Sequence, residues 1–275
     1  MSFPRSKKPF IAAMLFTLAL AGSPAQADPG EFTQKGLKAL EINDVKKALS
    51  AFEAGVKAEE TDAYFYLGRM YESGIGVRQN MGRAIQLYEK AAEKGSARAL
   101  NQLGMLYLGA PGVLQDFEKA RDFLKRAAEA GNAEAEFNYG SLLQEGKVVD
   151  KDPREANRWF EKSAKQGYVP AQLRLARNYQ MGIGTKKNPE QAFYWYLQAA
   201  VRGHPYALYE VGIRYMRGDG TVKDLVQAHK NLNLALARGY EKALPPLREL
   251  TEKLDREQLL KAQEEAREWK PVVRQ

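Results

Sequence analysis

Apolar residues along most of this chain recur every three or four positions, in short blocks that end at glycine. In one such block, Leu67 and Tyr71 follow Ala63 at steps of four. This spacing places the three side chains on one face of an α-helix. Two glycines, Gly74 and Gly76, interrupt the pattern, and a second block with a helical period follows. The sequence therefore predicts two amphipathic helices joined by a glycine-containing loop.

The whole pattern returns every 36 residues. Four kinds of position keep this step: an alanine in the first block, a glycine after the second, an Asn or Asp before the second, and an alanine inside the second. They are Ala63, Ala99, Ala135, Ala171, Ala207 and Ala243; Gly95, Gly131, Gly167, Gly203 and Gly239; Asn80, Asp116, Asp152, Asn188 and Asp224; and Ala84, Ala120, Ala156, Ala192 and Ala228. A fixed period of this length is typical of solenoids, whose units bury their apolar faces against their neighbours.

Local signals mark the ends of the predicted helices. The Asn or Asp before each second helix is a favoured N-cap, and Pro153 and Pro189 follow it at the first helical position. Glu155, Gln191 and Gln227 lie three residues after such caps, as in a capping box. The glycine after each second helix is expected at C′ in a left-handed conformation. Glycine or alanine also recurs inside the first helices, where we expect the paired helices to approach closely; these positions are Gly68, Gly104, Gly140, Ala176 and Gly212.

The segment 99–132, ALNQLGMLYLGAPGVLQDFEKARDFLKRAAEAGN, and its counterparts resemble the Sel1-like repeat, a relative of the tetratricopeptide repeat. The resemblance spans residues 63–239 and implies an all-α fold, a right-handed superhelical solenoid of helix pairs. The third copy departs from the pattern, because residues 147–149 are Lys-Val-Val where glycine is expected. We assign residues 28–60 to a tetratricopeptide-like first repeat, 61–242 to five Sel1-like repeats, and 243–275 to capping helices.

The first 27 residues are predicted to be a cleavable signal peptide. A basic start with Arg5, Lys7 and Lys8 precedes the apolar run 9–22 and then the triplet 25–27, an A-x-A cleavage pattern. The alternative is a membrane anchor, but a span needs about 20 apolar residues. We therefore expect cleavage after Ala27 and export to the periplasm or the medium.

Charge and cysteine content exclude several classes of function. The net charge of +8 falls to +5 in the mature chain, since the removed segment holds three basic residues and no acidic one. The remaining charges are interspersed, so we predict no nucleic-acid partner. The chain has no cysteine, which excludes disulfides, a cysteine-linked lipid anchor and a thiol nucleophile.

No constellation of residues indicates catalysis. A glycine-rich loop can bind phosphate, but the recurrence of these loops favours turns. His204 and His229 fall at unrelated positions of the repeat, and no serine lies in a G-x-S-x-G motif. We therefore predict no catalytic residue, no metal and no cofactor, and we expect that the protein is not an enzyme. Some cysteine-rich relatives have been linked to β-lactam chemistry, but their disulfides are absent here, so a cell-wall or β-lactam hydrolase is the less favoured alternative.

By resemblance to tetratricopeptide arrays, the first helices line the concave face that binds partners. The candidate protein-binding residues are large or charged side chains at variable first-helix positions: Phe65, Arg69, Glu72, Met105, Phe137, Arg177, Tyr206, Tyr209, Ile213 and Met216. Exposed aromatic residues, Met and Arg are enriched in interface cores. Burial of these residues between neighbouring repeats is the alternative interpretation for each of them.

The resulting hypothesis is a non-catalytic, exported scaffold or adaptor that binds another protein, such as an envelope component. An alternative within the family is a periplasmic immunity protein that neutralises a secreted toxic effector such as a phospholipase. The fifth copy carries the most apolar first-helix positions, so we expect its Tyr209 and Met216 to supply affinity, with Arg69 and Glu72 tuning specificity.

Overall fold

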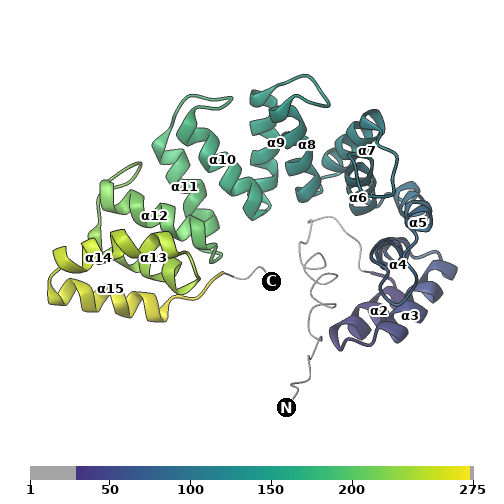
Figure 1. Cartoon of the computed structure of the whole chain (residues 1–275), viewed down its shortest axis with the longest axis horizontal. Coiled ribbons are helices and arrows are strands. Elements are labelled where there is room, and N and C mark those ends of the chain that lie inside the picture. Colours follow the sequence, from purple (N-terminus) through teal and green to yellow (C-terminus); the bar gives the residue numbers. More distant parts are fainter. Residues whose placement is uncertain (1–28, 273–275) are drawn as a thin grey trace, which may run out of the picture. The chain divides into compact units, whose positions relative to one another are not determined.

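The computed structural model describes residues 29–272, which form fourteen α-helices and one short 3-10 helix, η1 (Glu241–Ala243) (Figure 1). The predicted signal peptide lies outside the described residues. The helices are α2 (Glu31–Glu41), α3 (Val45–Lys57), α4 (Thr61–Ser73), α5 (Met81–Glu93), α6 (Ala97–Tyr107), α7 (Phe117–Glu129), α8 (Ala133–Glu145), α9 (Pro153–Lys165), α10 (Val169–Met181), α11 (Pro189–Ala200), α12 (Pro205–Arg217), α13 (Leu225–Ala237), α14 (Leu244–Lys253) and α15 (Arg256–Glu268). The predicted all-α solenoid of helix pairs is confirmed.

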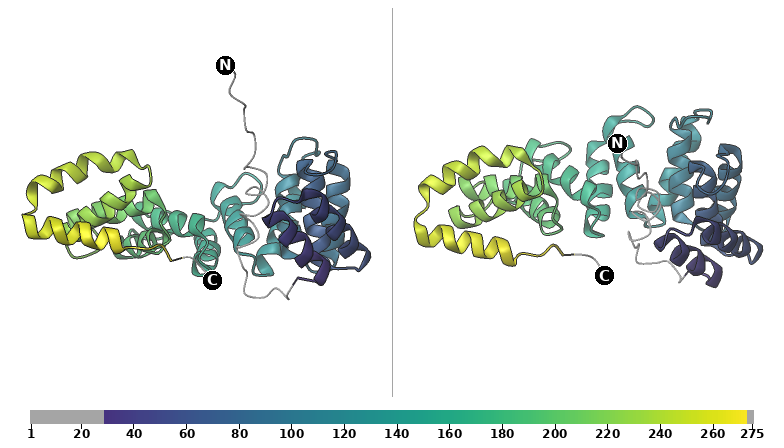
Figure 2. Two further views of the ribbon diagram at one scale, coloured as in Figure 1. Left: turned by 90° about the horizontal axis from the view of Figure 1, so that it is seen from below. Right: turned by 60° about the horizontal axis from the view of Figure 1, so that its bottom comes forward.

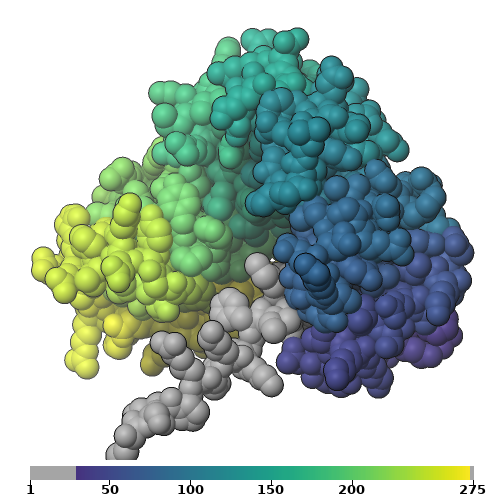
Figure 3. Space-filling model, turned by 45° about the vertical axis from the view of Figure 1, so that its right-hand side comes forward, coloured from purple at the N-terminus to yellow at the C-terminus, as the bar shows by residue number. Residues whose placement is uncertain are grey.

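The chain divides into two compact units, Met1–Tyr139 and Gly140–Gln275, and the division falls within α8. Within each unit the helices pack in chain order, so that α4 contacts α5 and α6 contacts α7 in unit 1, and α10 contacts α11 and α12 contacts α13 in unit 2. We call α4, α6, α8, α10 and α12 the first helices of their repeats, and α5, α7, α9, α11 and α13 the second helices. At the C-terminal end of unit 2, α14 and α15 both pack against α13 (Figure 2). In the space-filling view this end of the chain is drawn in yellow (Figure 3).

The predicted N-caps of all five second helices are confirmed. In each helix the side chain of Asn80, Asp116, Asp152, Asn188 or Asp224 accepts a hydrogen bond from the backbone N–H three residues later, at 2.9–3.0 Å. The reciprocal bond of a capping box forms at Asp255 and Gln258 of α15. Two of the predicted partners in the repeats bond elsewhere: Glu155 pairs with Arg158 at 3.0 Å, and Nε2 of Gln227 donates to Glu265 at 2.7 Å. The cap itself is therefore the local signal that begins these helices.

Replacing Asn188 with alanine is expected to lower the free energy of unfolding by about 1 kcal/mol, because the N–H of Gln191 loses its acceptor. The conservative change Asn188→Asp keeps an acceptor at the same place and should cost less. Urea unfolding followed by circular dichroism compares the two variants. Equal losses would show that the cap does not stabilise α11.

The glycine loops turn the chain between paired helices. Gly74, Gly182 and Gly218 are C-caps in the left-handed conformation, with φ of 67°, 75° and 74°. Gly95, which follows a second helix, has φ of 86°, as expected for C′. These conformations support the interpretation of the loops as turns, because they meet the backbone requirement for which glycine is favoured.

The small residues inside the first helices allow each pair to pack closely. A Cβ added to Gly68 would lie 2.7 Å from Cε1 of Tyr88, and one added to Gly212 would lie 2.7 Å from Cγ of Leu232. Gly104 and Gly140 meet Leu124 and Phe160 in the same way. The large residue of each second helix therefore occupies space that the glycine leaves, as the sequence predicted.

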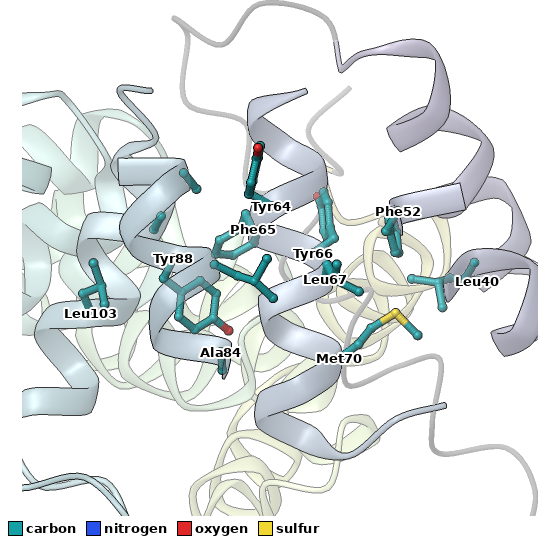
Figure 4. Packing of buried hydrophobic residues seen from close by; sticks show 14 of the residues in the cluster. Leu40, Phe52, Tyr64, Phe65, Tyr66, Leu67, Met70, Ala84, Tyr88 and Leu103 are labelled. Carbon is teal, nitrogen blue, oxygen red and sulfur yellow. The ribbon is translucent and has the colours of Figure 1, made fainter. Parts of the chain in front are cut away.

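The core of unit 1 is continuous from the first helix pair into the repeats (Figure 4). The rings of Phe52 and Tyr66 stack with centroids 5.4 Å apart, and Phe65 packs against Tyr88 at 5.8 Å. Phe65 is only 3% exposed. Its prediction as a partner-contacting residue is therefore wrong, because Tyr66 and Tyr88 bury its ring inside the repeat.

Hydrogen bonds also hold the first and last described segments of the chain against neighbouring helices. The carboxylate of Glu60 accepts from the N–H groups of Phe32 and Thr33 at 3.0 and 2.8 Å, which fixes the start of α2. In unit 2 the N–H of Val272 donates to the carbonyl of Val201 at 2.8 Å. The residues that follow α15 thus fold back on the turn after α11.

Candidate protein-binding surface

The predicted binding residues differ widely in exposure. Met105 in unit 1 is 40% exposed, and Arg177 in unit 2 is exposed as well. The remaining candidates apart from Phe65 are half-buried: Arg69, Glu72, Phe137, Tyr206, Tyr209, Ile213 and Met216. Met105 and Arg177 stand at the same position of their repeats, 72 residues apart, but Arg69 and Ile213 at that position are half-buried, so exposure there differs from repeat to repeat.

In unit 1, Glu72 connects three helices. Its carboxylate accepts from the hydroxyl of Tyr88 on α5 and from Nε2 of Gln102 on α6, the latter at 2.8 and 3.0 Å. Arg69 lies 3.8 Å from the same carboxylate. Burial, reinforced by Glu72, raises the pKa of Tyr88 well above its usual value. Glu72 therefore serves the packing of consecutive repeats, a use that the sequence did not reveal.

Other polar residues of the first helices in unit 1 also find partners on the next repeat. Nη1 of Arg98 donates to the hydroxyl of Tyr66 at 3.1 Å, and Nδ2 of Asn138 donates to Oδ1 of Asn101 at 2.9 Å. Burial raises the pKa of Glu134, while the charge of Arg69 opposes that shift. Acidic and basic groups on these helices thus offset one another within the unit.

In unit 2 a group of polar side chains surrounds the hydroxyl of Tyr196 on α11. This hydroxyl donates a hydrogen bond to Oε1 of Gln180 at 3.1 Å. Tyr196 and Gln180 stand at the positions of Tyr88 and Glu72, so the same link between first and second helix recurs three repeats later. We define the Tyr196 cluster as Tyr196 with its neighbours on α10 and α12: Arg177, Gln180, Tyr206, Glu210 and Arg214.

The pKa of Tyr196 reports how these groups converge. Burial raises it, Glu210 adds to the shift, and the positive charges of Arg214 and Arg177 both oppose it. The ring of Tyr206 lies edge-on to Tyr196 with centroids 5.9 Å apart. Side chains from α10, α11 and α12 therefore meet at one hydroxyl group.

Arg214 is the least expected member of the cluster. It is 2% exposed and occupies the repeat position that Met70, Leu106 and Leu142 fill with apolar side chains. Nη1 pairs with Glu210, and the guanidinium stacks on Tyr196 with Cζ 4.5 Å from the ring centroid. Nε and Nη2 are buried and have no hydrogen-bond partner among residues 29–272. Buried donors without acceptors are costly, so this arginine is not explained by packing.

Arg214 and Glu210 are not among the predicted binding residues, because that prediction used the first-helix positions of Phe65, Arg69 and Glu72 and did not include theirs. The sequence nevertheless marks Arg214 as unusual. At the same position of the other four repeats the residue is apolar or a small polar one: Met70, Leu106, Leu142 and Asn178. A charged residue at a core position is rare unless it is paired or functional.

The aromatic patch predicted in the fifth repeat is partly used for packing. The ring of Tyr209 lies 5.0 Å from that of Tyr240, and Tyr206 lies 5.9 Å from the same ring. Tyr209 and Tyr206 are therefore half-buried against the residue that precedes η1. Their role in binding stays a prediction.

The two histidines have local structural roles. His204 is the N-cap of α12, where its Nδ1 accepts from the N–H of Ala207 at 3.4 Å. His229 lies in α13 with Nε2 3.3 Å from Oγ1 of Thr251, and its Nδ1 is buried without a hydrogen-bond partner in the described part of the chain. Burial lowers the pKa of both imidazoles.

These shifts predict that the protein loses stability as the pH falls below about 6.5, the usual histidine pKa. A depressed pKa means that the folded state binds fewer protons than the unfolded state, so protonation favours unfolding. His204→Asn keeps an N-cap acceptor but cannot titrate there. Urea midpoints between pH 7 and pH 5 should therefore fall less for His204→Asn than for the wild type. Parallel pH profiles would contradict this assignment.

Within residues 29–272, no group of three or more His, Cys, Asp or Glu residues could hold a metal ion. Across the same residues, no helix combines the length and apolar character that a membrane crossing needs.

Comparison with known proteins places the repeats in context. The Sel1 repeat model matches five consecutive segments, residues 61–96, 97–132, 133–168, 169–204 and 205–240. A Sel1 repeat protein from Oxalobacter formigenes is 26% identical, with a TM-score of 0.68 over 85% of this chain and 97% of that chain. No curated protein matches the chain.

Two further solved structures share the fold at lower identity. A protective antigen of uropathogenic Escherichia coli is 22% identical, with a TM-score of 0.50 over 86% of this chain and 60% of that chain. An immunity protein from Pseudomonas aeruginosa is 18% identical, with a TM-score of 0.53 over 79% of this chain and 85% of that chain. Likenesses at this level support the fold alone.

Proposed function

Because this chain belongs to the Sel1 repeat family, whose repeats mediate protein interactions, we propose that it is an exported, non-catalytic scaffold or adaptor that binds another protein. The binding surface consists of first-helix residues, and recognition makes or breaks no covalent bond. The observation that carries this proposal is the exposure of two large first-helix side chains, Met105 and Arg177, although Arg69 and Ile213 at the same repeat position are half-buried. Met and Arg are both enriched at protein interfaces.

The proposal is tested by finding a partner and then measuring its affinity. Immobilised mature protein, residues 28–275, is incubated with envelope extract, and retained proteins are identified by mass spectrometry. Calorimetry with the purified partner then compares Met105→Ala and Arg177→Ala with two controls at exposed sites away from the first helices, Leu114→Ala and Arg154→Ala.

We expect at least one first-helix variant to bind several-fold more weakly, while both controls bind as the wild type does. Retention of no protein beyond that on empty beads would argue against a binding role in the envelope. Equal affinity of all four variants would place the binding surface elsewhere.

Export rests on the predicted signal peptide and makes a separate prediction. The protein recovered from the periplasm or the medium should begin at Asp28, because cleavage after Ala27 removes the basic and apolar segment. Intact-mass spectrometry of the recovered protein measures this directly. A mass that includes residues 1–27, or recovery only with the membrane fraction, would contradict export by cleavage.

A second candidate function is that of a periplasmic immunity protein against a secreted toxic effector such as a phospholipase. The solved immunity protein from Pseudomonas aeruginosa with this fold motivates it. If a toxin gene lies beside the gene for this chain, co-expression should restore growth of cells that direct that toxin to the periplasm. Failure of rescue, with both proteins present in the periplasm, would leave the scaffold role as the better proposal.

A further inference from the structure

We propose that the first-helix face of unit 2, formed by α10 and α12, binds an acidic segment of the partner protein, with Arg177 and Arg217 as its contact residues. This inference rests on the proposed function and deepens it by naming the chemistry of the partner. It commits to one kind of occupant, a carboxylate-rich stretch of polypeptide.

The charge of the first helices reverses along the chain. The helices α4, α6 and α8 together hold five acidic and two basic residues, a net charge of −3. The helices α10 and α12 hold four arginines and one glutamate, a net charge of +3. The whole mature chain is only mildly basic, so the excess positive charge on these two helices is local. A local positive field attracts and orients an acidic partner.

The basic residues on these two helices are all arginine: Arg174, Arg177, Arg214 and Arg217. A guanidinium presents a planar fork of donors that matches both oxygens of a carboxylate, whereas a lysine ammonium acts as a point charge. Arginine is also the charged residue favoured in interface cores. This composition suits recognition of Asp and Glu side chains.

Arg177 and Arg217 are the arginines that a partner can reach. Both are exposed, and neither takes part in an ion pair within residues 29–272. In unit 1, by contrast, Arg69 and Arg98 are half-buried and engaged with Glu72 and Tyr66. The charges at the surface of α10 and α12 are therefore available, while those of α4 and α6 already have partners.

The residues beneath this face leave its positive charge largely uncompensated. Glu210 is the one carboxylate on α10 and α12, and it pairs with Nη1 of Arg214. Two further donors of Arg214, Nε and Nη2, lack a partner among the described residues. Glu145 at the end of α8 offsets part of the charge of Arg174. No acidic group on α10 or α12 is therefore left to pair with Arg177. The positive charge of Arg177 acts on the Tyr196 hydroxyl, where it opposes the increase in pKa caused by burial.

The surroundings favour a polypeptide over a nucleic acid. Ile213 occupies the repeat position of Arg177 on the next first helix, and Tyr206 and Met216 are half-buried on the same helix. Apolar side chains among a few arginines suit an acidic segment that also carries apolar residues. Nucleic acid binding instead requires a longer basic stripe that follows a phosphate backbone.

The probe for this inference is a fluorescein-labelled peptide in which Glu alternates with Leu or Phe. Its twin carries Gln in place of every Glu. Fluorescence anisotropy measures both against the mature protein at low and at high salt. Two double variants have the same net charge: Arg177→Gln with Arg217→Gln on the proposed face, and Arg121→Gln with Arg154→Gln at exposed positions of second helices. Circular dichroism confirms that both fold.

We expect the Glu peptide to bind about tenfold more tightly than the Gln peptide, with the difference shrinking at high salt. The Arg177→Gln, Arg217→Gln variant should lose that preference, and the Arg121→Gln, Arg154→Gln control should keep it. Equal binding of the two peptides, or equal effects of the two double variants, would overturn the inference. Tighter binding of a single-stranded oligonucleotide that displaces the Glu peptide would also overturn it.

These outcomes are distinguishable from failure of the proposed function. A partner recovered from envelope extract that binds the Arg177→Gln, Arg217→Gln variant as tightly as the wild type would refute the acidic-segment inference and leave the scaffold role intact. Peptide selectivity as expected, without any partner recovered from the envelope, would refute the envelope scaffold role alone.

Discussion

Replacing Gly184 with valine is expected to lower the free energy of unfolding by about 3 kcal/mol or more, a combination of backbone strain and a clash. Gly184 has φ of +67°, which costs a β-branched residue about 1–2 kcal/mol. A Cβ there would also lie 2.2 Å from the carbonyl oxygen of Pro153 at the start of α9. Because this neighbour is backbone at a helix start, it can move only with the helix.

Gly239 in the same unit is the matched control. It has φ of +83°, but no atom lies within 4 Å of an added Cβ. Gly239→Val should therefore lower the free energy of unfolding through backbone strain alone, whereas Gly184→Val should lower it through both strain and the clash. Thermal unfolding should show the difference as a melting temperature lower by several degrees, at about 2–4 °C per kcal/mol. Equal shifts would mean that α9 moves freely and that the loop does not lock consecutive repeats together.

Removing Glu210 is expected to destabilise unit 2 by about 3–5 kcal/mol, because Arg214 would be left as a buried charge without its partner. Arg214→Met should instead be neutral or stabilising by about 1 kcal/mol, since replacing a buried charge with a packed apolar side chain is often favourable. Met70 shows that methionine fits this repeat position, where it is 0% exposed.

Urea unfolding of Glu210→Ala, Arg214→Met and the double variant forms a double-mutant cycle, which gives the free energy of unfolding of each variant and the interaction energy of the pair. The double variant should recover most of the stability that Glu210→Ala loses. If Arg214→Met is instead as unstable as Glu210→Ala, the arginine contributes through packing that methionine cannot supply. A stable Arg214→Met that binds the partner more weakly would indicate that this buried charge is retained for recognition.

The sequence by itself determined the repeat, the helix boundaries and the caps. These features depend on contacts within a few residues: Asn188 caps an N–H three positions away, and the left-handed glycines satisfy a local backbone requirement. The pairing of small and large residues was also predictable, because Gly68 and Tyr88 belong to one repeat whose register recurs five times. Periodicity made each of these signals visible more than once.

Only the tertiary structure decided which first-helix side chains remain available. Phe65 and Met105 are both large apolar residues at variable positions, yet one is 3% and the other 40% exposed. Exposure depends on what neighbouring helices place beside each residue, such as Tyr88 against Phe65 and Tyr240 against Tyr209. The convergence of three helices at Tyr196, and the burial of Arg214 beneath it, arise from the stacking of successive repeats. The residues that meet Tyr196 lie ten or more positions from it along the chain, so helical period alone does not reveal them.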